Sequence, residues 1–122
     1  MSIAPRAPRR NKQPEAALQA ASAEFLNLKL PKNYVSIHVP NGAQLAKPWH
    51  AKRLKAQGMQ PGCVDLLIFG AGRTVGIELK APGGYLSPVQ KSFHARLEAA
   101  GVRVFTCRSV DEVANVVKWM VQ

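Results

Sequence analysis

The sequence predicts an α/β domain in which a mixed β-sheet is flanked by helices, in the order α-β-β-β-α-β-α. Three observations support this prediction. Apolar residues recur at helical spacing within 15–29, three short strand-like runs follow between 34 and 80, and two serine caps then open helices on either side of a strand at 102–107. At 122 residues the chain is long enough for one domain with its own hydrophobic core.

The first helix is expected over residues 15–29. Pro14 suits the first turn of a helix, and Glu15 then lies near the positive end of the helix dipole. The apolar face of this helix is expected to contain residues spaced three and four apart, namely Leu18, Ala21, Phe25 and Leu28. Residues 31–33 break the helix, and the alternating stretch YVSIHV (34–39) predicts the first strand.

A β-hairpin is expected in the middle of the chain. The preceding stretch, 43–62, is irregular and mostly loop, with room for one helical turn before Gly58. VDLLIF (64–69) predicts a buried strand, and TVGIELK (74–80) predicts the strand that returns from it. The four residues GAGR between them predict a tight turn.

The last third of the chain predicts a helix, a strand and a final helix. Ser87 is a typical N-cap, with proline next to it and Gln90 three residues after it, and Gly101 ends this helix. Its expected apolar face consists of Val89, Phe93, Leu97 and Ala100. VRVFTC (102–107) predicts a strand, and Ser109 with Glu112 predicts a second capping box. The residues of the last helix expected to face inward are Val113, Val116, Val117 and Met120.

Charge is the strongest global feature of the chain. Seventeen Lys and Arg residues stand against seven Asp and Glu residues, a net charge of +10. Residues 1–55 contain ten basic and two acidic residues (net +8), whereas residues 56–122 contain seven and five (net +2). Basic charge concentrated in one part of a small domain is typical of proteins that bind polyanions, most often DNA or RNA. Residues 1–13 are expected to form a flexible basic arm.

The composition also indicates a compartment. No apolar run approaches the about 20 residues needed to span a bilayer, and the N-terminus has no apolar segment typical of a secretory signal. Cys63 and Cys107 lack the spacing of a zinc site, so both are expected to be reduced thiols. The expected location is therefore the cytoplasm.

The hairpin carries the candidate catalytic residues. Side chains alternate along a strand, so Glu78 and Lys80 point to one face, and Asp65 at the start of the partner strand lies within reach of them. Two carboxylates suit Mg²⁺, which prefers oxygen ligands. A lysine beside them could orient an attacking water or stabilise charge that develops on a phosphate.

These residues resemble a known family. Asp65 followed at a distance by Glu78-Leu79-Lys80 is similar to the motif of the PD-(D/E)xK nucleases. The stretches GCVDLLIF, GIELKAPGGYLSPVQ and VRVFTC resemble the virus-type replication-repair nuclease (VRR-NUC) domain of that superfamily, and the resemblance covers residues 15–113. It implies a restriction-endonuclease-like αβββαβ core with an extra C-terminal helix, and one nuclease domain over 14–122. Val64 stands where the family usually has proline.

The resemblance also implies roles for individual residues. Asp65, Glu78 and the backbone carbonyl of Leu79 would bind Mg²⁺ or Mn²⁺, and Lys80 would be the catalytic lysine. Gln90 would face the site from the start of its helix. The acid of the first helix would be Glu15, with Glu24 as the fallback.

Each residue also has a purely structural interpretation. Glu78 and Lys80 could form a solvated strand face paired with Asp65, and Asp65 could be a turn residue. Gln90 fits a capping box equally well, and an acid at Glu15 is favoured by the helix dipole in any case. His38, His50 and His94 are expected to lie on the surface or in the core rather than to bind a ligand. Tyr85 could stack on a base or sugar, but a packing role is favoured.

These residues therefore predict a metal-dependent deoxyribonuclease. Cutting both strands of a duplex or junction suggests a homodimer, and the resemblance implies branched or junction DNA as the substrate and a bacterial or phage-infected host cell. The basic residues expected to contact DNA phosphates are Arg6, Arg9, Arg10, Lys12, Lys47, Lys52, Arg53 and Lys55. Two alternatives stay open: a non-catalytic nucleic-acid-binding module on the same fold, and an RNA-binding basic protein unrelated to nucleases.

Overall fold

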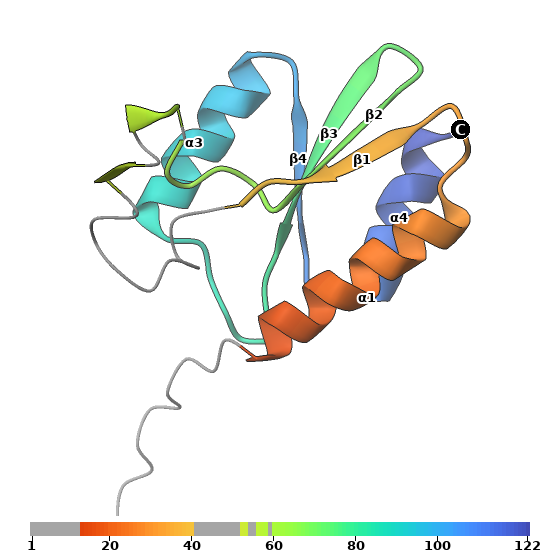
Figure 1. Cartoon of the computed structure of the whole chain (residues 1–122), viewed down its shortest axis with the longest axis horizontal. Helices are drawn as coiled ribbons and strands as arrows, with labels where there is room; N and C mark the ends of the chain where they lie inside the picture. The colour runs from red at the N-terminus through yellow and green to blue at the C-terminus, as the bar shows by residue number, and fades with distance from the viewer. Residues whose placement is uncertain (1–12, 41–51, 54–55, 59) are drawn as a thin grey trace, which may run out of the picture.

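The structure, a computed structural model, describes residues 13–40, 52–53, 56–58 and 60–122. Its element order matches the predicted α-β-β-β-α-β-α order, and its α/β architecture with a mixed sheet confirms the predicted fold class (Figure 1). The elements are α1 (Gln13–Lys29), β1 (Val35–His38), β2 (Leu66–Gly70), β3 (Arg73–Leu79), α3 (Pro88–Ala99), β4 (Arg103–Cys107) and α4 (Val110–Met120). Within the described residues, no helix has the length and apolar character to cross a membrane.

The four strands form one sheet in the order β1-β2-β3-β4. The β1/β2 and β2/β3 pairs are antiparallel and the β3/β4 pair is parallel, so the sheet is mixed. The parallel pair requires a crossover, which α3 provides. Figure 1 shows α3 on one side of the sheet and both α1 and α4 on the other side.

The core lies between the sheet and the pair α1 and α4. Leu66 pairs with Ile77 and Ile68 pairs with Val75, so these side chains share one sheet face, and all four are buried. The four residues of α4 predicted to face inward are all buried: Val113, Val116, Val117 and Met120. Because side chains alternate, Asp65, Glu78 and Lys80 point to the opposite face, which α3 covers.

Two predicted helix faces were wrong in part. In α1, Leu28 is 73% exposed and Ala21 is exposed, whereas Ser22 and Leu26 are the buried positions. In α3, Val89 is 54% exposed and the buried residue is His94. Both predictions selected apolar side chains alone, and in each helix a polar residue lies at the centre of the face that packs against the sheet.

The hairpin turn is shorter than the four residues predicted. Ala71 and Gly72 alone connect β2 to β3, and both have positive φ, +54° and +73°. A two-residue turn of this kind matches the right-handed twist of the strands, so pairing continues to Gly70 and Arg73. In the stretch 43–62, predicted to be mostly loop, Lys52, Arg53 and Ala56 are helical.

Candidate active site

Asp65, Glu78 and Lys80 lie together at one end of the β2–β3 hairpin. All three are buried, with 6%, 1% and 2% of their surface exposed. The backbone N–H of Asp65 donates to the Ile77 carbonyl over 3.1 Å, and the N–H of Leu79 donates to Asp65 Oδ2 over 2.7 Å. These two bonds hold the Asp65 carboxylate against the strand that carries the glutamate and the lysine.

The burial of Glu78 and Lys80 excludes the solvated strand face that the sequence left open. Strand β3 is paired on both sides, to β2 and to β4, and Glu78 lies opposite Thr106 in the parallel ladder. The N–H of Lys80 donates to the Cys107 carbonyl over 3.0 Å. A buried carboxylate and a buried ammonium each lose hydration, which is costly unless other charges or hydrogen bonds compensate. Such a pair at the end of a central strand is typical of a functional site.

The charge state of Glu78 reflects this environment. Burial raises the pKa of Glu78 to about 10, and a hydrogen bond and charge repulsion from Asp65 act in the same direction. Lys80 opposes this effect and Glu15 adds to it. Two adjacent buried carboxylates therefore hold a proton between them at neutral pH in the absence of a cation. A divalent cation would neutralise both carboxylates, so their chemistry fits the predicted metal.

The oxygen donors available to a cation are few. Asp65 and Glu78 supply carboxylates, and Leu79, between Glu78 and Lys80 in the chain, supplies a backbone carbonyl. In the part of the chain that the structure describes, no group of three or more His, Cys, Asp and Glu side chains is arranged to hold a metal. Mg²⁺ usually keeps several waters and takes only one or two protein carboxylates. Two carboxylates are therefore sufficient for Mg²⁺, but not for a closed structural site such as that of zinc.

Glu15 is the acid of α1 that lies near this group. It is half-buried in the first turn of α1, and its Oε1 is 3.6 Å from the position that a Cβ on Gly84 would occupy. Glu24, the fallback, is exposed, whereas Glu15 is half-buried and raises the pKa of Glu78. The geometry thus favours Glu15 over Glu24, and a catalytic role for it stays a prediction.

The turn after Lys80 is fixed by an arginine that follows the neighbouring strand β4 at the same end of the sheet. Arg108, the residue that follows β4, donates from Nη1 to the Ala81 carbonyl over 3.0 Å and to the Gly84 carbonyl over 2.5 Å. The Gly84 N–H also donates to the Ala81 carbonyl over 2.9 Å. The turn therefore has a defined shape next to Glu15 and Lys80.

Gln90 forms the capping box that the sequence allowed. The Ser87 N–H donates to Gln90 Oε1 over 2.9 Å, and the Gln90 N–H donates to Ser87 Oγ over 3.2 Å. Gln90 therefore has the structural role that the sequence allowed, because its side-chain oxygen accepts the hydrogen bond that caps the start of α3. A catalytic role for Gln90 stays a prediction.

Sequence reasoning missed two groups around the carboxylates. His94 Nε2 lies 3.0 Å from Glu78 Oε1, and both side chains are buried. His38 Nδ1 donates to the Asp65 carbonyl over 3.2 Å, and the side-chain amide of Gln19 contacts the His38 ring. A usable signal existed for His94, because Gln90 and His94 are four residues apart and share a helix face.

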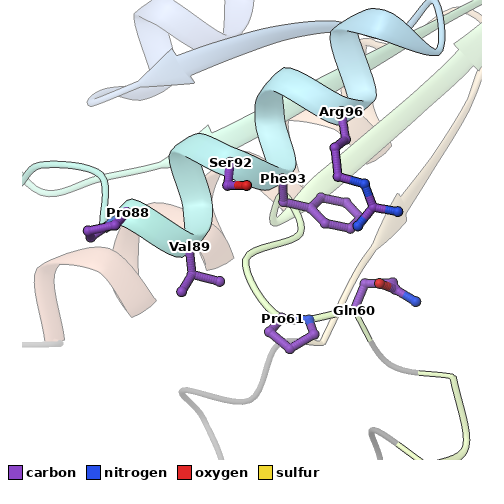
Figure 2. Close-up of a pocket in the computed structure, with 7 residues that line it drawn as sticks. All are labelled: Gln60, Pro61, Pro88, Val89, Ser92, Phe93 and Arg96. Carbon is purple, nitrogen blue, oxygen red and sulfur yellow. The ribbon is translucent and has the colours of Figure 1, made fainter.

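The outer face of α3 borders a groove of about 390 Å³. Figure 2 shows Val89, Phe93 and Arg96 pointing from α3 towards Pro61, and the Arg96 guanidinium lies 5.3 Å from the centre of the Phe93 ring. The described residues that line this groove do not include the carboxylates or Lys80. The groove is therefore separate from the cluster of Asp65, Glu78 and Lys80.

Gly62 explains how the chain enters the site so close to α3. A Cβ at this position would lie 2.6 Å from the Val89 carbonyl oxygen, and its φ of +81° favours glycine as well. The segment before Asp65 can therefore pack directly against the start of α3.

Two of the basic residues predicted to contact DNA are described by the structure. Lys52 and Arg53 are both exposed. The others lie outside the described residues, as does the predicted basic arm: Arg6, Arg9, Arg10, Lys12, Lys47 and Lys55.

Comparisons with known proteins agree on one family. The family model of the VRR-NUC domain matches residues 10–111. A solved VRR_NUC domain protein superposes with a TM-score of 0.69 at 22% identity, covering 86% of this chain and 85% of that chain. A second structure, a VRR_NUC domain, gives a TM-score of 0.58 at 18% identity, covering 86% and 95%. No curated protein matches the chain. At these identities the two structures support the fold.

Proposed function

This chain belongs to the VRR-NUC family of nuclease-type domains, as its motifs predicted, and on that premise we propose that it is a divalent-metal-dependent nuclease that hydrolyses phosphodiester bonds in DNA. The observation that carries the proposal is the burial of Asp65, Glu78 and Lys80 side by side on one sheet face. Their charges are costly to bury and match the requirements of phosphate hydrolysis.

Each residue has a role in this proposal. Asp65 and Glu78, with the Leu79 carbonyl, would hold Mg²⁺ or Mn²⁺. The bound cation would polarise the scissile phosphate and lower the pKa of its water. Lys80, an ammonium that only donates hydrogen bonds, would orient the attacking water or stabilise the negative charge that develops on the phosphate. The Leu79 N–H keeps the Asp65 carboxylate in place through its 2.7 Å bond to Oδ2.

The net charge of +10 supports DNA as the substrate, and exposed Lys52 and Arg53 are available for phosphate contacts. We further propose that the enzyme is a homodimer acting on branched or junction DNA, because one site cuts one strand at a time. Strand β1 lies at the edge of the sheet, and its Val35 and Ile37 are 57% and 45% exposed. An exposed apolar edge strand is a common site of self-association.

The test compares wild type, Lys80→Met and Lys91→Met on supercoiled, linear and four-way-junction DNA with Mg²⁺, Mn²⁺ or EDTA. Lys80→Met keeps the buried aliphatic stem and removes the ammonium, so cleavage should fall by about 100-fold or more. Lys91, an exposed lysine of α3, is the matched control and should retain wild-type cleavage. Light scattering on the same preparation should give the mass of two chains.

Two results would contradict the proposed nuclease activity. One is the absence of wild-type cleavage on every substrate with either metal, and DNA binding without cleavage would then favour the non-catalytic module. The other is equal cleavage by wild type and Lys80→Met. Tight binding to RNA that is indifferent to metal would favour the RNA-binding alternative.

A further inference from the structure

His94 is the buried residue of α3, and its ring points at a carboxylate of the candidate site. Its Nε2 lies 3.0 Å from Glu78 Oε1, and the two side chains are 7% and 1% exposed. We propose that His94 is a positioning residue that donates a hydrogen bond from Nε2 to Glu78 Oε1 and so leaves the second oxygen of Glu78 for the metal. This inference rests on the proposed function, because it assigns Glu78 as a metal ligand.

The direction of the hydrogen bond follows from the chemistry of metal binding. A carboxylate must be ionised to bind a cation, and an ionised carboxylate only accepts hydrogen bonds. His94 Nε2 must therefore carry the proton when the metal is bound. A neutral ring with its proton on Nε2 supplies this bond without adding a charge to the site.

The hydrogen bond from His94 matters because Asp65 is a competing partner for the Glu78 carboxylate. Glu78 also interacts with Asp65 through a side-chain hydrogen bond. A glutamate rotates about three side-chain bonds, so without a fixed partner its carboxylate can turn towards Asp65 instead of towards a shared cation. The bond from His94 commits one oxygen and fixes the orientation of the other.

The fold holds His94 where this bond requires it. The reciprocal hydrogen bonds of Ser87 and Gln90 fix the start of α3, one turn before His94. Glu78 is fixed from the other side, since its strand is paired to both neighbours. Gln90 and His94 share one helix face, but Gln90 uses its oxygen in the cap. In the described residues, the side chain of α3 that contacts the carboxylates is therefore His94, through Glu78.

A group that orients a metal ligand in this way is usually important for affinity. Replacing hydrogen-bond partners of ligands typically weakens metal binding or activity by about 10- to 100-fold. Loss of His94 should therefore weaken Mn²⁺ binding by about 10- to 100-fold, and excess Mn²⁺ should restore much of the cleavage rate.

The experiment measures Mn²⁺ binding by electron paramagnetic resonance, without DNA, and Mn²⁺ dependence of cleavage in parallel. The variants are His94→Leu, which removes the donor, and His94→Gln, whose amide nitrogen can reach the place of the imidazole Nε2. Ser92→Ala, an exposed position on α3, is the control. We expect weak binding for His94→Leu, and binding within a few-fold of wild type for His94→Gln and Ser92→Ala.

Wild-type affinity in His94→Leu would overturn the inference, and so would a His94→Gln variant as weak as His94→Leu. Circular dichroism in EDTA checks folding. If the leucine variant does not fold, His94→Asn replaces it, because its shorter amide does not reach Glu78, and equal affinity of the Asn and Gln variants would overturn the inference. Wild type that binds no Mn²⁺, or binds it equally after Glu78→Gln, overturns the proposed function instead.

Discussion

Replacing Glu78 with glutamine should remove a pH-dependent loss of stability from the metal-free protein. Burial and Asp65 raise the pKa of Glu78 to about 10 in the folded chain, whereas its ordinary value is 4.5. Between these values the folded state binds a proton that the unfolded state has lost. The stabilisation is therefore complete below pH 4.5 and decreases as the pH rises through the folded pKa.

The magnitude follows from the linkage between proton binding and folding. At about 1.4 kcal/mol per pH unit, a rise from pH 7 to pH 8.5 should lower the free energy of unfolding by about 2 kcal/mol. Glutamine has nearly the same shape, still accepts a hydrogen bond from His94 at Oε1, and does not ionise. The Glu78→Gln variant should therefore lack this decrease and gain stability over wild type as the pH rises.

The assay is urea unfolding in EDTA at several values between pH 7 and pH 8.5, for wild type, Glu78→Gln and the control Glu24→Gln. Taking the difference from wild type cancels the contribution of groups that Glu78 does not affect, such as Cys107, whose pKa burial raises to about 11. Glu24 is exposed, and its variant should keep the wild-type slope. The reasoning is refuted if wild type and Glu78→Gln lose stability equally with pH.

Two further predictions concern the residues that shape the site. Asp65→Ala should lower the free energy of unfolding by about 1–3 kcal/mol more than Asp65→Asn, because alanine leaves the buried Leu79 N–H without its acceptor; equal urea midpoints in EDTA would contradict this. Gly62→Ala should cost about 1–3 kcal/mol more than Gly83→Ala. Both glycines have φ of +81°, but only at Gly62 would the added Cβ meet the Val89 carbonyl, at 2.6 Å. Equal thermal midpoints of these two variants would show that the close contact relaxes freely.

The carboxylates could be found from the sequence because local rules place them. Strand alternation alone puts Glu78 and Lys80 on one face, and a short hairpin brings Asp65 to the same end. The sequence also predicted the inward residues of α4, because that helix has a continuous apolar stripe. Those predictions needed only the two-residue repeat of a strand, the apolar repeat of a helix and a short hairpin.

The partner of Glu78 could not be found in that way. His94 was expected to lie on the surface or in the core. Its position four residues after Gln90 indicates a shared helix face, but this spacing does not identify Glu78 as its partner. Its contact depends on the crossover that lays α3 over the sheet, and no spacing within α3 specifies which strand residue lies beneath it. The same limit applies to α1, where Ser22 is buried and Leu28 is exposed.

The two hydrogen bonds from Arg108 to the turn after Lys80 have a consequence for the thermodynamics of substrate binding. A glycine-rich segment such as 81–84 has high conformational entropy in the unfolded chain. Because Arg108 fixes the Ala81 and Gly84 carbonyls, this entropy is lost when the protein folds rather than when a ligand binds. A ligand that contacts this turn meets a surface that is already ordered, so more of its interaction energy remains as affinity.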